Sequence, residues 1–159
     1  MSDWTLRELR VLTAAHLDSL YERPMHERPG ALEPVTGRYR GHFLRWIDNA
    51  GARKPLWRLS EGLGFGVLPF GIDFDRRLWF FFDRRVAMGR FDLRAERSRW
   101  RDTQAFCLHY EVSRLPALVR GVLYDEVKPL SQGWLLGIGG VNAERGLGDH
   151  FYFALRRVR

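Results

Sequence analysis

Cysteine, lysine and long apolar runs are scarce in this chain. Its 159 residues include one cysteine, Cys107, and two lysines beside 24 arginines. A single cysteine excludes a disulfide within the chain, and the missing cysteine pairs remove the common framework of a zinc site. No run approaches the roughly 20 apolar residues of a membrane-spanning helix, and the N-terminal sequence lacks the apolar core of a signal peptide. We therefore expect a soluble cytoplasmic protein with no metal site.

Positive charge exceeds negative charge, with a formal net charge of +7 at pH 7. The preference for arginine over lysine is typical of a GC-rich bacterial genome. Seven arginines lie within residues 84–101, and nucleic acids bind such clusters of cations. In the stretch 87–97, however, apolar residues such as Phe91 alternate with Arg90 and Arg94. This alternation predicts the solvated face of a half-buried strand, and no nucleic-acid-binding motif accompanies it, so we do not expect a nucleic-acid partner.

Apolar residues are plentiful, with 45% hydrophobic and 14% aromatic residues, which suits one well-packed domain and not a disordered chain. Beyond residue 36 they form eight short runs that end in turns: Arg38–Trp46, Gly66–Phe74, Leu78–Asp83, Ala87–Arg97, Thr103–Val112, Leu118–Lys128, Gly133–Gly139 and His150–Val158. Short strands at regular spacing indicate a sandwich or a closed barrel. Eight strands close into a barrel that is filled by side chains or holds one small ligand. We expect a mainly β fold, a single eight-stranded antiparallel barrel over residues 37–159.

Residues 1–36 follow a different pattern. Apolar residues recur there at steps of three and four, which predicts an amphipathic helix: Leu6, Leu9, Leu12, Leu17 and Leu20. Ser2 or Asp3 is the expected N-cap, and Pro24 should end the helix. The linker that follows would let this helix pack on the barrel. A second short helix, between early strands, is expected over Pro55–Gly62.

One short motif and three later segments suggest a family. The first predicted strand opens with Gly37-Arg38-Tyr39-Arg40-Gly41, and the later segments are Asp125–Val127, Leu135–Gly137 and Phe151–Arg157. In order and spacing they resemble the calycin (lipocalin-like) barrels, and among these the small bacterial proteins that carry a G-x-W-x-G motif and have no assigned reaction. Tyr39 stands where that family has tryptophan. The resemblance implies that the Tyr39 ring plugs one barrel end under a late-strand arginine, here Arg156 or Arg157.

Nine polar residues are candidates for chemistry: His42, Cys107, His109, Tyr110, Tyr124, Asp125, Glu126, His150 and Tyr152. The runs Thr103–Val112 and Leu118–Lys128 are consecutive and expected to pair antiparallel, which would bring His109 near Tyr124 or Asp125. Such a group in an apolar barrel suits acid–base catalysis or the orientation of a polar ligand group. The alternative is a satisfied polar trio at the barrel rim. Both interpretations remain open at this stage.

Cys107 shares a strand face with His109, but residues two apart on a strand stand about 6–7 Å from each other. That separation is too large for direct proton transfer, so we expect Cys107 to be a small core residue. No set of His, Asp and Glu residues has metal-binding spacing, and no dinucleotide-binding loop is present. We therefore expect no cofactor.

Residues of the predicted strands provide the expected lining of a barrel cavity: Trp79, Phe81, Phe91, Leu93, Leu123 and Tyr152. Two function classes remain. The protein is either a carrier or sensor that binds an apolar small molecule, such as a fatty acid, isoprenoid or polyketide, or a cofactor-independent barrel enzyme. The enzyme would be an isomerase, cyclase or lyase acting on a hydrophobic biosynthetic intermediate, with His109, Tyr124 and Asp125 as its catalytic residues. A homodimer is compatible with both classes.

Overall fold

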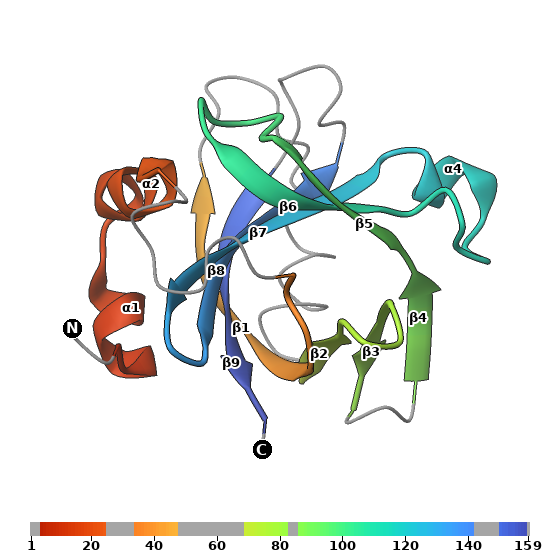
Figure 1. Cartoon of the computed structure of the whole chain (residues 1–159), viewed down its shortest axis with the longest axis horizontal. Helices are drawn as coiled ribbons and strands as arrows, with labels where there is room; N and C mark the ends of the chain where they lie inside the picture. The colour runs from red at the N-terminus through yellow and green to blue at the C-terminus, as the bar shows by residue number, and fades with distance from the viewer. Residues whose placement is uncertain (1–3, 25–33, 48–68, 83–85, 142–149, 159) are drawn as a thin grey trace.

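Antiparallel strand pairing wraps most of the chain into a barrel (Figure 1). The computed structural model describes residues 4–24, 34–47, 69–82, 86–141 and 150–158. The strands are β1 (Arg38–Ile47), β2 (Phe70–Asp73), β3 (Leu78–Phe81), β4 (Val86–Arg90), β5 (Asp92–Arg97), β6 (Gln104–His109), β7 (Leu123–Ser131), β8 (Trp134–Val141) and β9 (His150–Arg157). They form one nine-stranded sheet in the order β4-β3-β2-β1-β9-β8-β7-β6-β5. The fold is mainly β, as predicted.

The two edge strands of this sheet, β4 and β5, are consecutive in the chain and separated by Phe91 alone. The stretch Ala87–Arg97, predicted as one strand, therefore divides: its first part pairs with β3 and its second part with β6. This division gives nine strands where eight were predicted. Because the chain itself joins the two edges, the barrel is nearly closed. The predicted alternation holds around the division, since Phe91 is buried while Arg90 and Arg94 are exposed.

Two short helices, α1 (Leu6–Val11) and α2 (Ala14–Glu22), replace the single N-terminal helix that was predicted. Thr5 caps α1 in a capping box with Glu8, so the cap is neither Ser2 nor Asp3. Thr13 caps α2, since its side chain accepts a hydrogen bond from the main-chain N–H of His16. Threonine favours caps over helix interiors, which explains why the predicted single helix is divided at this residue.

A further helix, α4 (Ala117–Arg120), occupies the beginning of the predicted strand Leu118–Lys128, so β7 starts only at Leu123. The helix predicted over Pro55–Gly62 lies outside the described residues. None of the helices in the described ranges is long and apolar enough to cross a membrane.

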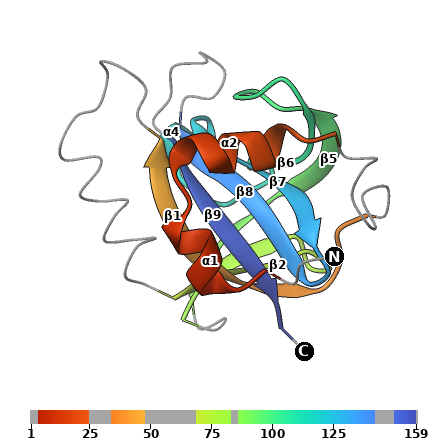
Figure 2. The same ribbon diagram turned by 90° about the vertical axis from the view of Figure 1, so that its left-hand side faces the viewer.

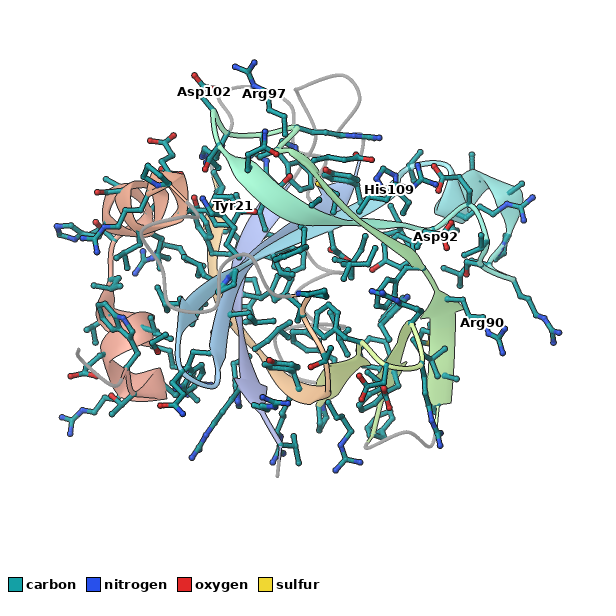
Figure 3. The ribbon with its side chains drawn as sticks, viewed as in Figure 1. Tyr21, Arg90, Asp92, Arg97, Asp102 and His109 are labelled. Carbon is teal, nitrogen blue, oxygen red and sulfur yellow. The ribbon has the colours of Figure 1, made fainter. Side chains whose placement is uncertain are left out.

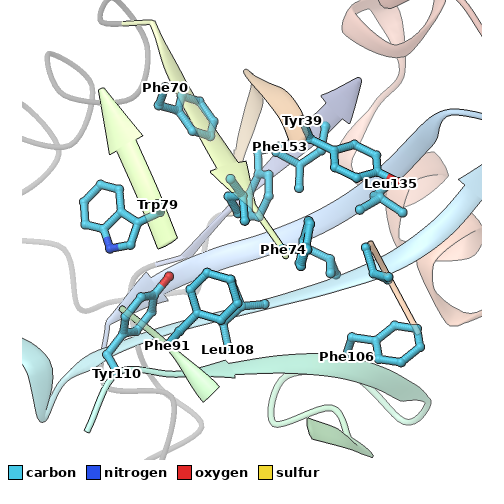
Figure 4. Close-up of a cluster of buried hydrophobic side chains, with 14 of the residues drawn as sticks. Tyr39, Phe70, Phe74, Trp79, Phe91, Phe106, Leu108, Tyr110, Leu135 and Phe153 are labelled. Carbon is cyan, nitrogen blue, oxygen red and sulfur yellow. The ribbon is translucent and has the colours of Figure 1, made fainter. Parts of the chain in front are cut away.

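Aromatic rings fill the barrel interior (Figure 4). Tyr39 meets Phe74, Phe74 meets Phe91, and Phe91 meets Tyr110, each edge to face, with ring centroids 5.5, 5.9 and 6.3 Å apart. These are the favoured geometries of aromatic pairs. The interior is therefore a continuous network of rings contributed by strands that are distant in sequence.

Two glycines make room for interior rings. A Cβ at Gly41 would lie 2.0 Å from the Phe70 ring, and one at Gly137 would lie 2.3 Å from the Phe153 ring. Any other residue at either position would displace a buried aromatic ring. Gly41 of the opening motif is thus required by packing and not by backbone conformation.

The helices cover the outer face of one wall of the barrel, where α1 and α2 lie across β8 and β9 (Figure 2). Side chains of α2 join outward residues of five strands in a second buried cluster: Leu17, Leu20, Tyr21, Ile47, Ala105, Cys107, Tyr124, Leu136, Ile138 and Tyr152. Leu9 of α1 packs with Trp134 and Ala154 in a third. This wall is therefore buried on both faces.

A lysine fixes the C-terminal end of α2 to the barrel. Lys128 of β7 is fully buried, and its Nζ donates to the main-chain carbonyls of Tyr21 and Arg23 at 2.6 and 2.7 Å and to Thr103 Oγ1 at 2.5 Å. Carbonyls at a helix C-terminus lack partners within the helix and carry the negative end of its dipole. The ammonium group satisfies these carbonyls and neutralises that end.

We predict that Lys128→Met lowers the free energy of unfolding by on the order of 3 kcal/mol, because buried carbonyls lose a charged donor. Thermal unfolding measures the loss, and hydrogen exchange of the α2 amides should accelerate. Arg23→Ala is the control, since it removes an exposed side chain and leaves the carbonyl that Lys128 contacts. Equal stability of the wild type and Lys128→Met would contradict this role.

Candidate functional site

One end of the barrel is closed by buried side chains. Tyr39 is 6% exposed and packs on Phe74, and in the β1–β9 pairing it lies directly opposite Arg157. Arg157 also reaches Gly37, where a Cβ would lie 3.2 Å from its guanidinium. Arg156 points to the outer face instead, where its Cζ lies 5.9 Å from the centre of the Trp134 ring. Of the two arginines expected beside Tyr39, the structure thus places Arg157 there.

At the opposite end of the barrel, the described inward-facing side chains are less buried. Partly buried side chains of β1, β4 and the start of β7 pack there against the interior cluster: Phe43, Trp46, Met88 and Leu123. We call this the open end. Strands β6 and β7, which pair through His109 and Tyr124, are connected at this end.

A carboxyl group lies inside the barrel near the open end. Asp125 of β7 alternates with Leu123 and Val127, which belong to the interior cluster or pack on it. The hydroxyl of Tyr110 donates a hydrogen bond to Asp125 Oδ2. On the other side, a Cβ at position 139 would lie 2.3 Å from Asp125 Oδ1, so the neighbouring strand has glycine where the carboxyl group needs space.

Burial changes the acidity of both members of this Tyr110–Asp125 pair. Desolvation raises the pKa of Asp125 to about 7, partly opposed by the hydrogen bond from Tyr110. Desolvation and the nearby Asp125 carboxylate hold the pKa of Tyr110 well above its ordinary value. At neutral pH, Tyr110 is therefore a hydrogen-bond donor, and Asp125 exchanges between its acid and carboxylate forms. The pair can donate to, accept from, or exchange a proton with a polar group placed beside it.

The structure separates His109 from Asp125. His109 pairs with Tyr124, as predicted, and their rings meet edge to face at 5.9 Å. Leu108 pairs with Asp125, so Asp125 lies on the inner face while His109 and Tyr124 lie on the outer face. Consecutive residues of a strand point to opposite faces. The predicted register did not decide whether Tyr124 or Asp125 lies on the same face as His109. His109 instead has its Nε2 3.1 Å from Glu96 Oε2 (Figure 3).

The expected lining residues also divide between the two faces. Trp79, Phe81 and Phe91 are buried in the interior cluster, and Leu93 and Leu123 pack against it. Tyr152 lies outside, because its neighbours in β9, Phe151 and Phe153, take the inner positions.

Tyr152 donates from its hydroxyl to Asp18 Oδ1 of α2 at 2.5 Å. The guanidinium of Arg101 binds the same oxygen at 2.6 and 2.7 Å. Tyr152 therefore holds a helix on the barrel and does not line the interior. Nearby Cys107 is buried, and burial raises the pKa of its thiol to about 12, which keeps it protonated and unreactive.

The Tyr110–Asp125 pair was not predicted, although both residues were noted. The alternation of residues along the two strands could have predicted the pair. Phe106 and Leu108 share the inner face of β6, and Tyr110 continues this alternation just after the strand ends. Asp125 shares a face of β7 with two apolar residues. The requirement for glycine at 139 could not be read from the sequence, since it depends on the register between β7 and β8. In the described ranges, no three His, Cys, Asp or Glu side chains gather as a metal site would require.

Known proteins offer few parallels to this chain. No protein-family model matches it, and no curated protein matches it. A solved structure titled as a crystal structure of a protein from Thermomonospora curvata is similar over 97% of this chain and 93% of its own, at 17% sequence identity and a TM-score of 0.48.

We predict that Asp125→Asn stabilises the protein at pH 8 and has a smaller effect at pH 4.5. The folded-state pKa of Asp125 is about 7, above the ordinary value, so the unfolded chain loses this proton first and stability falls as pH rises from about 4 to about 7. Asparagine does not ionise, so the variant should not lose stability in this pH range through residue 125. Melting temperatures across this range measure it, with the exposed Asp102→Asn as the control. If the melting temperatures of the wild type and Asp125→Asn change in parallel with pH, ionisation of the Asp125 carboxyl group does not destabilise the folded protein.

We predict that Tyr39→Ala lowers the free energy of unfolding by about 3–5 kcal/mol, the usual cost of truncating a buried aromatic side chain. Tyr39→Phe keeps the ring that packs on Phe74 and should remain near wild-type stability. Denaturant unfolding compares the three proteins. A stable alanine variant would mean that the ring does not contribute to closing the barrel.

Proposed function

We propose that this protein binds an apolar small molecule through the open end of the barrel, as a carrier or sensor, and that Tyr110 and Asp125 receive its one polar group. The observation that carries the proposal is a half-buried carboxyl group that is desolvated by an otherwise aromatic interior. Burying such a group is costly unless it is hydrogen-bonded. In the described part of the chain, Tyr110 is the partner found for Asp125, so the carboxyl group retains capacity for another.

Several apolar side chains outside the interior are exposed to solvent. Phe82 and Val86 adjoin the end of β3 and the start of β4, and Val112, Leu118 and Val119 lie between β6 and β7. Leu118 of α4 is 82% exposed. An apolar ligand that binds beside any of these side chains would remove their apolar surface from water.

The resemblance to calycin barrels agrees with this proposal, because an eight-stranded barrel of that kind has an interior large enough for one small ligand. Fold alone does not determine function. Membership in the calycin family is therefore part of the proposal and not a premise of it.

A second candidate function is acid–base catalysis on such a ligand, as in an isomerase, cyclase or lyase without a cofactor. The pKa of Asp125, at about 7, favours it, since a general acid or base is most effective near the working pH. One variant, Asp125→Asn, distinguishes the two candidate functions. An enzyme would lose turnover in Asp125→Asn while still binding its substrate, whereas a carrier leaves its ligand unchanged in either form.

We predict that retinol, a fluorescent apolar molecule with one hydroxyl group, binds the wild type and binds Tyr110→Phe roughly threefold to tenfold more weakly. This is the range expected for the loss of one neutral hydrogen bond. Tyr124→Phe is the matched control, because it makes the same change in a buried tyrosine of the outer face. Fluorescence titration gives the affinities. Equal weakening by both variants, or by neither, would refute binding at Tyr110.

A further inference from the structure

A second feature of the barrel lies on the outer side of β1 and β9. Arg40 and Arg156 stand directly opposite each other in the pairing of these strands. Both are exposed and point outward, because the residues beside them, Tyr39 and Leu155, belong to the interior cluster. Like charges directly opposite each other on a sheet destabilise it. Within the described ranges no acidic side chain forms an ion pair with either arginine.

A neutral histidine lies next to these arginines on the same face. The ring of His42 is 6.3 Å from that of Trp134, over which Arg156 also lies. Desolvation, together with the smaller effects of the positive charges of Arg10 on α1, Arg40 on β1 and Arg156 on β9, lowers the pKa of His42 to about 4. Three guanidinium groups thus face one imidazole, and each repels the protonated form.

A pocket of about 310 Å³ opens beside Arg40. Its lining combines arginine and apolar side chains: Arg38, Tyr39, Arg40, Pro69, Phe70, Phe80 and Val158. Phe80 points outward, since Trp79 and Phe81 on either side of it face the interior. Its ring covers Gly71, where a Cβ would lie 2.7 Å from the Phe80 Cζ atom, and Gly71 pairs with Arg40.

The pocket and the arginine pair therefore lie next to each other, with Arg40 common to both. Asp73 lies opposite Arg38 in the β1–β2 pairing, so the charge of Arg38 has an acidic neighbour across the strands, and the excess positive charge is at Arg40 and Arg156. The volume is at the lower end of small-molecule pockets. Guanidinium groups bind carboxylate and phosphate oxygens through two parallel hydrogen bonds.

We propose that this outer-wall pocket binds an anionic amphiphile, a carboxylate or phosphate monoester with a short apolar body, whose head group lies between Arg40 and Arg156. The head group neutralises two like charges that the fold holds together. The apolar body packs against Phe80, Pro69 and Val158. This site is separate from the Tyr110–Asp125 pair, so the two proposals stand or fall independently.

The test is calorimetric titration of the full chain with octyl phosphate. A parallel titration with octanoate tests a carboxylate head group. Octanol and inorganic phosphate represent the body and the head group alone. Octyl phosphate or octanoate should bind at least about tenfold more tightly than either half. Arg40→Gln and Arg156→Gln should each weaken binding by about tenfold or more, the effect of losing one charge-assisted contact. Circular dichroism checks that both variants keep the fold, which is expected because both side chains are exposed.

Arg97→Gln is the matched control, because it removes the same charge from an exposed position on β5, which is separated from β9 by three strands of the sheet (Figure 3). Equal weakening by all three arginine variants would indicate attraction to net charge and would overturn the proposal. Binding of octanol as tight as that of octyl phosphate, unaffected by the arginine variants, would overturn it as well, because the molecule would then lie in the interior.

The pKa of His42 provides an independent test of where the head group lies. An anion between Arg40 and Arg156 favours the protonated imidazole, so saturation with octyl phosphate should raise the His42 pKa from about 4 toward its ordinary value. Titration of the imidazole proton signals by NMR measures this shift. An unchanged pKa in the presence of bound octyl phosphate would show that the head group lies elsewhere and would overturn the proposal.

Discussion

A buried ammonium group fixes the C-terminal end of α2 to the barrel. Lys128 Nζ has three acceptors, two of them main-chain carbonyls at the end of α2. With this contact in place, Leu17 and Leu20 lie over β7, β8 and β9. The outer face of that wall is then buried as the inner one is. The barrel and its helices therefore form a single packed unit with two cores that share a sheet.

Burial on both faces explains which strand predictions were right. The stretch 87–97 has water on one side, so its alternation identified the inward position of Phe91 from sequence alone. In β9 the run from Phe151 to Leu155 is apolar throughout, because α2 covers the outward positions. Such continuous runs are typical of strands buried on both faces. They do not distinguish inside from outside, which is why Tyr152 was assigned to the wrong face.

The register of β6 and β7 limited the prediction of the site in the same way. The sequence indicated that these strands pair and that His109 lies near Tyr124 or Asp125; the strands do pair, and His109 lies opposite Tyr124. It did not determine which of Tyr124 and Asp125 turns inward, and a shift of one residue exchanges the two faces. The packing that decides this comes from elsewhere: Gly139 on β8 leaves space for an inward carboxyl group, and Tyr21 on α2 occupies the outward side. Long-range contacts of this kind leave no local pattern.

Two charged groups of β7, the fully buried Lys128 and the half-buried Asp125, differ in how well their hydrogen-bonding capacity is satisfied. Lys128 has three acceptors within hydrogen-bond distance, which matches its three donor hydrogens, so its burial is accounted for by the attachment of α2. Asp125 has four lone-pair positions and, among the described residues, the hydroxyl of Tyr110 as its donor. A carboxyl group that served stability alone would be expected to gain more donors or be replaced by an apolar side chain. Its placement beside a glycine, near the open end of an aromatic interior, is the observation from which we propose that it receives the polar group of an apolar ligand.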